Sequence, residues 1–593
     1  MADCTELHKR PVQVSEIASV YKWDIVVAFD IGTSYSGYAY SDKKEIKTNS
    51  VTLNEWTGNL PIDSKAKAPS TILCNEDKTF HSFGHDAEKF YAEQASHKAH
   101  TKWYRFRNFK MALYHEKDIG ETFEIQDDRK STSMPAIDVF AYAIQSLKSH
   151  FEEAITDRGI TADSDNTLYV ITVPAIWPES AKQFMKKAGL KAGIPEHQIL
   201  LALEPEAAAL YCKTLEDHTL TRDFSPETKY MVLDMGGGTV DLVVHEVLKN
   251  GSLVEVYKAS GGDWGGNIID AEFVAFLKKF FENDKCLEEL WNSAPEDALD
   301  FERDFEAKKR QVSNSLSGKI RLTLPLRLQQ FPNKLVKDPK KKDSISFAHM
   351  YVQNEEFKQF FAVIKDKIIS LIKNILKETG KIDLVLLVGG LSSSKYIFQE
   401  IKQHPSFSGI KFISPKDPGL VVLKGAVLFG HNPQAVTARV CRYTYGIGVL
   451  KDFDERIHPN SKCAIVDGDK VCQDVLDVLV YEGDTVHYDE TMTYTSHSSH
   501  RQRNQKNALI KKELFQARGV VKGKPTFVTD DGVESVGKFL NHPPEGGWSD
   551  LVNFETKFYF GQTNIRIEDY DITNKVQIKC EFELDEYKTG VSP

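Results

Sequence analysis

The chain has 593 residues, of which 41% are hydrophobic and 27% are charged, and this composition is typical of a soluble globular protein with several domains. Its 85 acidic and 75 basic residues give a net charge of −10, which argues against nucleic acid and acidic membranes as partners. No segment approaches the ~18 consecutive apolar residues of a membrane span, so no span is predicted.

The N-terminal segment and the cysteines bear on the compartment. Residues 1–22 lack the apolar segment of a signal peptide, and we expect them to form a flexible tail. The eight cysteines include no Cys-x-x-Cys spacing, so neither a zinc site nor a redox pair is indicated. Scattered cysteines fit a reducing compartment, which predicts a cytoplasmic protein and leaves nuclear entry open.

A tight glycine turn is predicted after the first buried strand. An apolar run leads into Asp30, and Gly32, Thr33 and Ser34 follow before a second strand starts at Tyr35. Glycine lets a ligand approach backbone N–H groups closely, and hydroxyl groups add further donors. Alone, one such segment is weak evidence for a ligand site, and an ordinary glycine-rich β-hairpin is favoured.

Strands and helices alternate in the next part of the chain. Buried strands are predicted over residues 168–174 and 199–203, and helices over residues 135–156 and 179–190. The second of these strands leads directly into Glu204. Such alternation predicts an α/β fold with functional groups at the carboxyl ends of the strands.

The hairpin design returns in residues 231–241. Asp234 takes the place of Asp30, three glycines form the turn, and Asp241 follows them. Carboxylates at both ends of such a turn suit a hydrated divalent cation. Two equivalent Asp-x-Gly hairpins indicate an internal duplication, with a ligand held between two similar halves.

Later segments add glycine turns and helical patterns. Glycine-rich turns occur over residues 261–266 and after a buried strand at 382–388. Residues 306–313 place four polar side chains on one helical face, which alone is typical of a solvated surface. One long amphipathic helix is predicted over residues 357–380.

The character of the chain changes at about Arg439. Short alternating segments, among them residues 558–560, 565–567 and 576–584, replace helical periodicity and predict a separate β domain. Residues 487–507 are polar, and a mobile loop is favoured there over a metal or nucleic-acid site.

Several phosphate-binding and catalytic signatures do not occur in the sequence. There is no P-loop, no dinucleotide Gly-x-Gly-x-x-Gly fingerprint, no His-Glu-x-x-His motif and no Gly-x-Ser-x-Gly elbow. Any phosphate site must therefore be of the two-hairpin kind.

The motifs together resemble the actin-like ATPase superfamily, and within it the 70-kDa heat-shock proteins. The matching segments lie in the family's order and cover about residues 24–435; they are residues 29–35, 170–175, 204–209, 233–241, 306–313 and 387–390. The match over 306–313 is to the family's adenosine-binding pattern and replaces the surface interpretation of that helix. The chain looks most like the divergent heat-shock 70 kDa protein 12 branch.

The resemblance implies a fold and a function. The expected fold is α/β, with an actin-like ATPase domain of two duplicated lobes around a nucleotide cleft over residues 23–435. A mainly-β substrate- or partner-binding domain without a helical lid follows over residues 436–593. The implied function is that of a slow, Mg²⁺-dependent ATPase and chaperone-like stress-response protein whose nucleotide state controls binding of a protein client or adaptor.

The resemblance also implies residue roles. Asp30 and Asp234 would hold Mg²⁺ through water, and Asp241 or Glu204 would orient or deprotonate the attacking water. Lys110, or less readily Lys102, would neutralise the transferred phosphoryl group, and Thr239 belongs to the catalytic set as well. The residues expected to hold ATP or ADP are Gly32, Thr33, Ser34, Tyr35, Gly236, Gly237, Gly238, Thr239, Gly262, Gly265, Gly266, Glu306, Lys309, Arg310, Ser313, Gly389, Gly390 and Ser392.

Three departures from the family pattern leave alternatives open. No arginine follows Gly389-Gly390, Lys182 stands where relatives have an arginine, and residues 432–447 lack the acidic, leucine-rich linker. One alternative is a nucleotide-responsive adaptor with little or no ATP turnover. Another is a small-molecule kinase of the same superfamily, although no acceptor-side motif is present.

Overall fold

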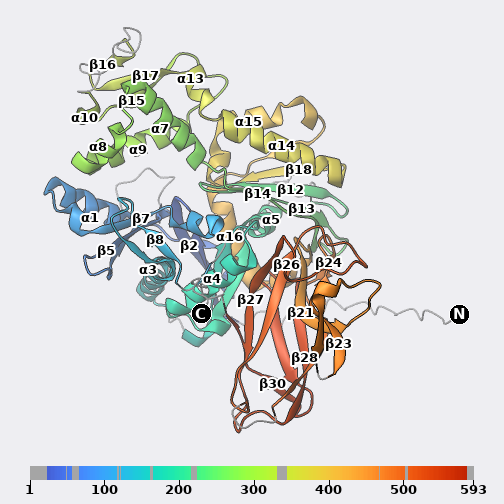
Figure 1. The fold of residues 1–593 in the computed structure, drawn as a ribbon. Coiled ribbons are helices and arrows are strands. Elements are labelled where there is room, and N and C mark those ends of the chain that lie inside the picture. Colours follow the sequence, from blue (N-terminus) through green and yellow to red (C-terminus); the bar gives the residue numbers. More distant parts are fainter. Residues whose placement is uncertain are drawn as a thin grey trace.

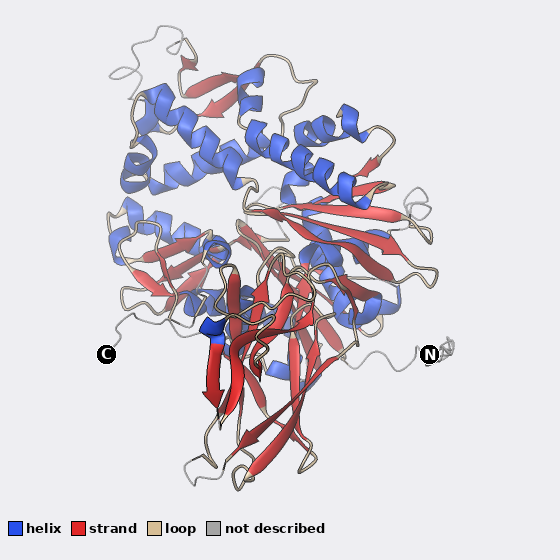
Figure 2. Ribbon diagram, turned by 45° about the vertical axis from the view of Figure 1, so that its right-hand side comes forward, coloured by secondary structure: helices blue, strands red, loops and turns tan. Residues whose placement is uncertain are grey.

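The computed structural model describes residues 23–48, 50–56, 66–116, 119–120, 122–160, 164–215, 224–329, 343–466, 468–500 and 505–583 (Figure 1). Two α/β lobes are followed by a C-terminal β region (Figure 2). The tail predicted over residues 1–22 lies outside the described residues. No helix within the described ranges is long and apolar enough to cross a lipid bilayer.

The first lobe is built on a sheet that carries the first predicted hairpin. Its strand order is β11 (Ile199–Leu203), β10 (Thr167–Val173), β1 (Ile25–Ile31), β2 (Tyr35–Asp42) and β3 (Thr52–Leu53), with β4 (Ala68–Pro69) also beside β2. β1 runs parallel to β10, and β2 returns antiparallel to β1. Every residue of β1 and β10 is buried, as expected of strands covered on both faces.

The second lobe repeats this arrangement around the second hairpin. Its strand order is β19 (Lys411–Ile413), β18 (Leu384–Val388), β12 (Lys229–Met235), β13 (Val240–Val247), β14 (Leu253–Gly262), β20 (Val436–Val440) and β24 (Thr485–His487). β12 pairs antiparallel with β13 and parallel with β18, as β1 pairs with β2 and β10. The predicted α/β class and the predicted duplication are confirmed.

Smaller sheets and helices complete the lobes. The small sheets are β6 (Phe80–Phe83), β5 (Thr71–Cys74) and β7 (Tyr104–Arg107); β8 (Glu124–Gln126) and β9 (Ser133–Pro135); and β15 (Lys319–Thr323), β17 (His349–Gln353) and β16 (Ile345–Ser346). The longer helices are α1 (Gly84–Ser96), α3 (Ala136–Asp157), α4 (Glu179–Lys191), α5 (Glu204–Thr214), α7 (Asn267–Phe281), α8 (Cys286–Ser293), α9 (Pro295–Lys309), α15 (Lys395–Lys402) and α16 (Val421–His431).

The prediction of one continuous helix over residues 357–380 is wrong, because the helix is interrupted. The structure has two helices there, α13 (Asn354–Gln359) and α14 (Ala362–Thr379). The chain turns at Phe360 and Phe361, whose rings are buried against Phe273 and Tyr396, respectively. Because the residues at the break are apolar and keep the helical spacing, the sequence pattern continues through it.

The two lobes meet through helices and ion pairs. α16 packs on β1 and β10 of the first lobe and on α5, and α5 contacts β12 of the second. Elsewhere, an ion pair of 3.1 Å joins Arg303 Nη2 on α9 to Glu88 Oε2 on α1. Thus α5 and α16 bridge the two sheets at the centre of the molecule (Figure 1).

The C-terminal region is a two-sheet β structure, drawn in orange and red in Figure 1. The larger sheet has the order β22 (Cys463–Val466), β23 (Asp469–Val480), β21 (Thr444–Asp452), β26 (Ile510–Ala517), β27 (Val533–Asn541) and β31 (Cys580–Glu583). The smaller sheet has the order β25 (Met492–Ser499), β28 (Leu551–Tyr559), β29 (Arg566–Asp571) and β30 (Val576–Ile578). Leu514, Phe539 and Phe558 are among the buried residues that pack between them.

Two expectations for this region are corrected. Residues 576–584 do not form one strand, because β30 pairs with β29 whereas β31 pairs with β27 in the other sheet. Residues 487–507 do not form a loop throughout, since β25 pairs with β28 along its whole length. β25 is an edge strand in which Thr and Ser alternate with larger side chains. Because so many of its residues are polar, the sequence favoured a loop over a strand there. Residues 501–504 lie outside the described residues.

The stretch that follows α16 joins the β region to the second lobe. β20 pairs parallel with β14, and β24 pairs antiparallel with β20. Residues near the start of the predicted β domain are therefore strands of the second lobe's sheet.

Close packing of α16 on α5 gives a test of this fold. A Cβ atom added to Gly425 would overlap the carbonyl group of Ala207. Alanine normally stabilises a helix interior by about 1 kcal/mol relative to glycine. We expect Gly425→Ala instead to destabilise the protein by about 1–3 kcal/mol, because backbone must move. Thermal unfolding measures this, with Gly390→Ala, whose Cβ would meet no atom within 4 Å, as the control. An unchanged midpoint for Gly425→Ala would contradict the packing.

Candidate active site

The turns of the two hairpins touch each other. A Cβ atom on Gly237 would lie 2.5 Å from Ser34 Oγ, and one on Gly238 would lie 2.5 Å from Thr33 Oγ1. Glycine permits this approach without any shift of the neighbouring hydroxyl groups, since real Cβ atoms essentially never come within 3.0 Å of another heavy atom. The structure thus brings the two predicted phosphate turns together at one place between the lobes.

The second turn is held from behind by the start of α7. The N–H groups of Gly265, Gly266 and Asn267 donate to the carbonyls of Gly238 (2.9 Å), Gly236 (3.0 Å) and Gly237 (2.8 Å), respectively. Within the described part of the chain, the N–H groups of Gly237 and Gly238 make no hydrogen bond. Fixed carbonyls and unused N–H groups are the arrangement that binds anions.

Asp30 lies beside this contact with both carboxylate oxygens engaged. Lys67 Nζ is 2.5 Å from Oδ2, and the Thr172 hydroxyl donates to Oδ1 over 3.1 Å. Burial would raise the pKa of Asp30, but the ammonium groups of Lys67 and Lys110 outweigh burial and lower it. Lys67 is a site residue that sequence reasoning missed.

Glu204 and Lys110 form a second buried ion pair. Lys110 Nζ is 2.6 Å from Glu204 Oε1, and it also lies 5.5 Å from the ring centre of Trp177. Burial raises the pKa of Glu204 to about 7; Asp30 and Asp241 add to that rise, and Lys110 opposes it. Burial would lower the pKa of Lys110, but Glu204 and Asp30 raise it.

Asp241 and Asp234 are the other two carboxylates of this group. The Ile176 N–H donates to Asp241 Oδ1 over 2.9 Å. Burial raises the pKa of Asp241, whereas that N–H group and the Thr239 hydroxyl oppose the rise. Burial, together with Glu204, Asp241 and Asp30, raises the pKa of Asp234 well above its usual range.

These six side chains and the two turns define the interlobe site. It contains four buried carboxylates, Asp30, Glu204, Asp234 and Asp241, against the two ammonium groups of Lys67 and Lys110. The carboxyl groups outnumber the ammonium groups by two, and their oxygen atoms are ligands that a divalent cation would accept. Among the described residues no three His, Cys, Asp or Glu side chains form a metal-binding group. A cation here would therefore be held by few carboxylates and complete its coordination with water and phosphate, as Mg²⁺ does.

The four predicted adenosine residues lie together on α9 and the turn that follows it. Lys309 is buried and pairs with Asp270 on α7 over 2.8 Å and with Glu306 over 2.5 Å. Arg310 pairs with Glu306 over 3.2 Å, and Ser313 is buried. Glu306 and Arg310 both act on the pKa of the Tyr35 phenol, which burial raises. The first hairpin and α9 are thus neighbours.

The third glycine turn reaches the interlobe site at Gly389. This residue has a φ of +85°, and a Cβ there would overlap the Asp234 carboxylate and the Met235 carbonyl. Gly390 faces open space, and the buried Ser392 hydroxyl donates to the Val388 carbonyl. The turn therefore contacts Asp234 through the backbone of Gly389.

The structure also gives the positions of other residues that bear on the predicted nucleotide site. Gly262 passes beneath the Trp264 ring at the end of β14, one turn before α7 begins. Lys102 is exposed and outside the interlobe site, which leaves Lys110 as the lysine at Glu204. Lys67 gave no sequence signal, since only the pairing of β4 with β2 brings it beside Asp30.

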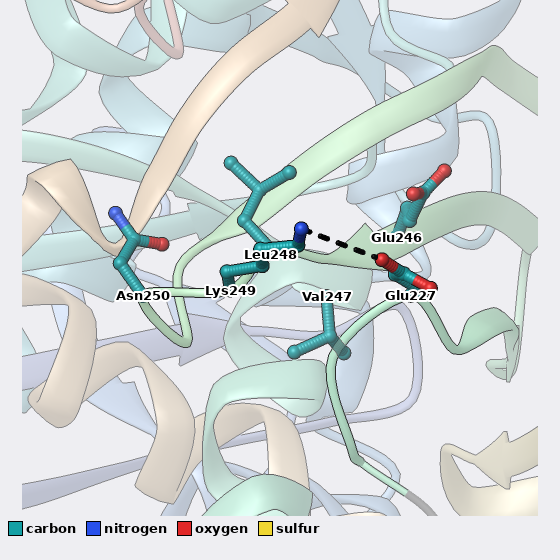
Figure 3. A pocket seen from close by; sticks show the side chains of 6 residues that line it. All are labelled: Glu227, Glu246, Val247, Leu248, Lys249 and Asn250. Carbon is teal, nitrogen blue, oxygen red and sulfur yellow. Dashed lines mark ion pairs between the residues drawn. The ribbon is translucent and has the colours of Figure 1, made fainter.

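A surface hollow at the other end of the β12–β13 hairpin is not part of this site. It is lined by Glu227, Glu246, Val247, Leu248, Lys249 and Asn250 (Figure 3). Glu246 pairs with Lys229 in the hairpin, whereas Asp241 pairs with Asp234 at the opposite end. Its ion pair, Lys249 to Glu227 at 3.9 Å, is exposed, so this hollow holds no comparable charge cluster.

Comparison with known proteins agrees with the geometry. The family model described as Hsp70 protein matches residues 63–455. Heat shock 70 kDa protein 12A of Mus musculus is 30% identical, over 95% of this chain and 92% of the relative. The 12A protein of Homo sapiens is 30% identical over 97% of this chain and 93% of the relative. Heat shock 70 kDa protein 12B of Homo sapiens is 29% identical over 95% and 91%, respectively. The chain therefore belongs to the Hsp70 family, and it is similar over nearly its whole length to the divergent 12A and 12B proteins.

Proposed function

We propose that this member of an ATP-binding family binds Mg·ATP or Mg·ADP at the interlobe site, hydrolyses ATP slowly, and couples its nucleotide state to a protein partner. The observation that carries the proposal is the cluster of four buried carboxyl groups and two lysines at the point where two glycine turns meet. The turns offer N–H groups to phosphate, and the carboxylates offer oxygen ligands to a cation.

Each charged residue of the interlobe site has its own role in the proposed reaction. Asp30 and Asp234 would hold Mg²⁺ largely through water, and the ion would offset phosphate charge. Lys110 stabilises charge on the transferred group. Asp241, fixed by the Ile176 N–H, orients the attacking water. Glu204, whose pKa of about 7 lies near neutral pH, accepts a proton from it.

Two chains of contacts support coupling to the C-terminal region. Glu206, in the same helical turn as Glu204, is bound by Arg439 of β20 through two bonds of 2.8 Å and 2.7 Å, with both side chains buried. Ile176, whose N–H holds Asp241, accepts a hydrogen bond at its carbonyl from Arg442. Glu204 thus lies two residues from the partner of Arg439, and Asp241 is joined to Arg442 through Ile176.

A third group of contacts joins α4 to the β region. Lys182, which replaces the family's arginine, donates to the Thr563 carbonyl over 2.9 Å. The Ile565 N–H donates to the buried Glu179 carboxylate over 2.8 Å.

We assign nucleotide binding to residues 23–435 and partner binding to residues 436–593. The scattered cysteines of the sequence fit a reducing compartment, and we assign the protein to the cytoplasm.

The alternative is a nucleotide-responsive adaptor with little turnover. The ion pairs Lys67–Asp30 and Lys110–Glu204 favour it, because they occupy groups that hydrolysis would require for metal and phosphate. Measured turnover decides between the two versions, while nucleotide binding is common to both.

Nucleotide binding is tested by calorimetry with ATP and ADP. We expect binding that requires Mg²⁺. We expect Gly237→Val to weaken it by at least roughly 100-fold, about 2.8 kcal/mol, because the added side chain would push Ser34 away. Glu227→Gln, at the far end of the same hairpin, is the matched control and should bind normally. Absence of Mg²⁺-dependent binding by the unaltered protein would refute the proposal.

Hydrolysis is tested by single-turnover measurements at saturating Mg·ATP. We expect Lys110→Ala and Glu204→Gln each to slow the chemical step by about 10²–10³-fold, as loss of one group that stabilises the transition state does. Lys102→Ala is the matched control, since this lysine is exposed away from the site. A folded, ATP-binding protein without measurable turnover would favour the adaptor.

Coupling is tested at Arg442, which contacts no residue proposed to touch nucleotide. We expect Arg442→Lys to slow single-turnover hydrolysis about tenfold, roughly 1.4 kcal/mol, because Ile176 would hold Asp241 less firmly. ATP affinity should stay unchanged. Arg518→Lys is the control, since Arg518 also stacks on Tyr443. Equal rates for both variants would argue against this route.

A further inference from the structure

Two cysteines lie directly opposite each other in the β22–β23 hairpin. Cys463 and Cys472 are register partners, and Ala464 and Val471 form the next pair. Their spacing along the chain matches no redox motif, which is why the sequence did not indicate a pair. Among the cysteines that the structure describes, no other two are register partners.

The position of this pair within the hairpin suits a disulfide bond. Val466 pairs with Asp469 at the closed end, and closing pairs of two-residue hairpins exchange hydrogen bonds. Because hydrogen-bonded and non-hydrogen-bonded pairs alternate, Cys463 and Cys472 occupy a non-hydrogen-bonded position, where Cα atoms lie about 4.5 Å apart. Disulfide bonds accept Cα separations of about 4.4–6.8 Å.

The two thiols differ in exposure. Cys472 is fully buried beside Val475 and Phe527, whereas Cys463 is half-buried on the edge strand of the sheet. Burial raises the pKa of the Cys472 thiol, and Cys463 adds to that rise while Lys462 opposes it, which is consistent with two neighbouring thiols. Cys463 is the one that a reagent in solution can reach.

We propose that Cys463 and Cys472 form a reversible redox pair that reacts with small disulfides such as oxidised glutathione. The Cys463 thiolate attacks one sulfur of the small disulfide, forming a mixed disulfide and releasing one small thiol. Cys472 then loses its proton and attacks the Cys463 sulfur, which releases the second small thiol. Two protein thiols are oxidised to one disulfide, and one small disulfide is reduced to two thiols.

The bond would tie the edge strand to the rest of the sheet. β22 pairs only with β23 among the described strands, and it carries the exposed side chains of Ile465 and Val466. A covalent link at its first residue would fix this apolar edge. The two cysteines lie outside the interlobe site, so the proposed redox reaction does not depend on whether the protein hydrolyses ATP.

The test uses the full-length protein, equilibrated with oxidised glutathione, then acid-quenched, alkylated and mapped by peptide mass spectrometry. We expect loss of two hydrogen atoms in a Cys463–Cys472 linked peptide, reversed by dithiothreitol, with the buried Cys441 still reduced. In Cys472→Ser, glutathione should stay attached to Cys463. In Cys463→Ser, Cys472 should stay unmodified.

Three results would overturn the proposal. They are a stable glutathione adduct on Cys463 of the unaltered protein, a disulfide that joins either residue to another cysteine, and a Cys463–Cys472 bond that forms only in denaturant. Mapping of the unaltered protein is decisive even where a serine variant fails to fold.

Discussion

The burial of four carboxyl groups beside only two lysines at the junction of the two lobes is the constraint on which the proposed function depends. Removing a carboxylate from water costs several kcal/mol unless a partner offsets the cost. Lys67 and Lys110 offset it for Asp30 and Glu204, and the raised pKa of Asp234 shows where compensation is incomplete. The carboxylates come from both sheets, so a cation bound there also stabilises their association.

The glycine turns explain how such a charge cluster can be assembled at all. Ser34 and Gly237 are in contact, and so are Thr33 and Gly238, so a Cβ atom added to either glycine would meet a hydroxyl group of the other hairpin. In the proposed function, a phosphate bound at this point would meet N–H groups from the turns and the ammonium group of Lys110. The repeated hairpin is therefore a structural requirement of the site as well as a sign of duplication.

Features encoded in local pattern were predictable from the sequence, whereas features that depend on tertiary pairing were not. Both Asp-x-Gly hairpins and the α/β alternation follow from apolar runs and glycine. Lys67 is placed only by the pairing of β4 with β2, and the helix break at Phe360 is hidden because apolar spacing continues through it. Cys463 and Cys472 become neighbours only through strand register. The adenosine helix was identified by resemblance, since its polar face alone is typical of a surface.

The first turn of α5 carries contacts both to the interlobe site and to the strand that leads into the C-terminal region, and the proposed coupling rests on it. Lys110 binds Glu204, so engagement of Lys110 by phosphate would weaken that ion pair and free the carboxylate to accept a proton. Glu206, two residues further on, is held by the buried Arg439, and breaking such a pair typically costs about 3–5 kcal/mol. Movement at one end of this turn is thus resisted at the other. A partner that shifts β20 would change the position of Glu204, and a nucleotide that draws Lys110 away would change the strain on β20.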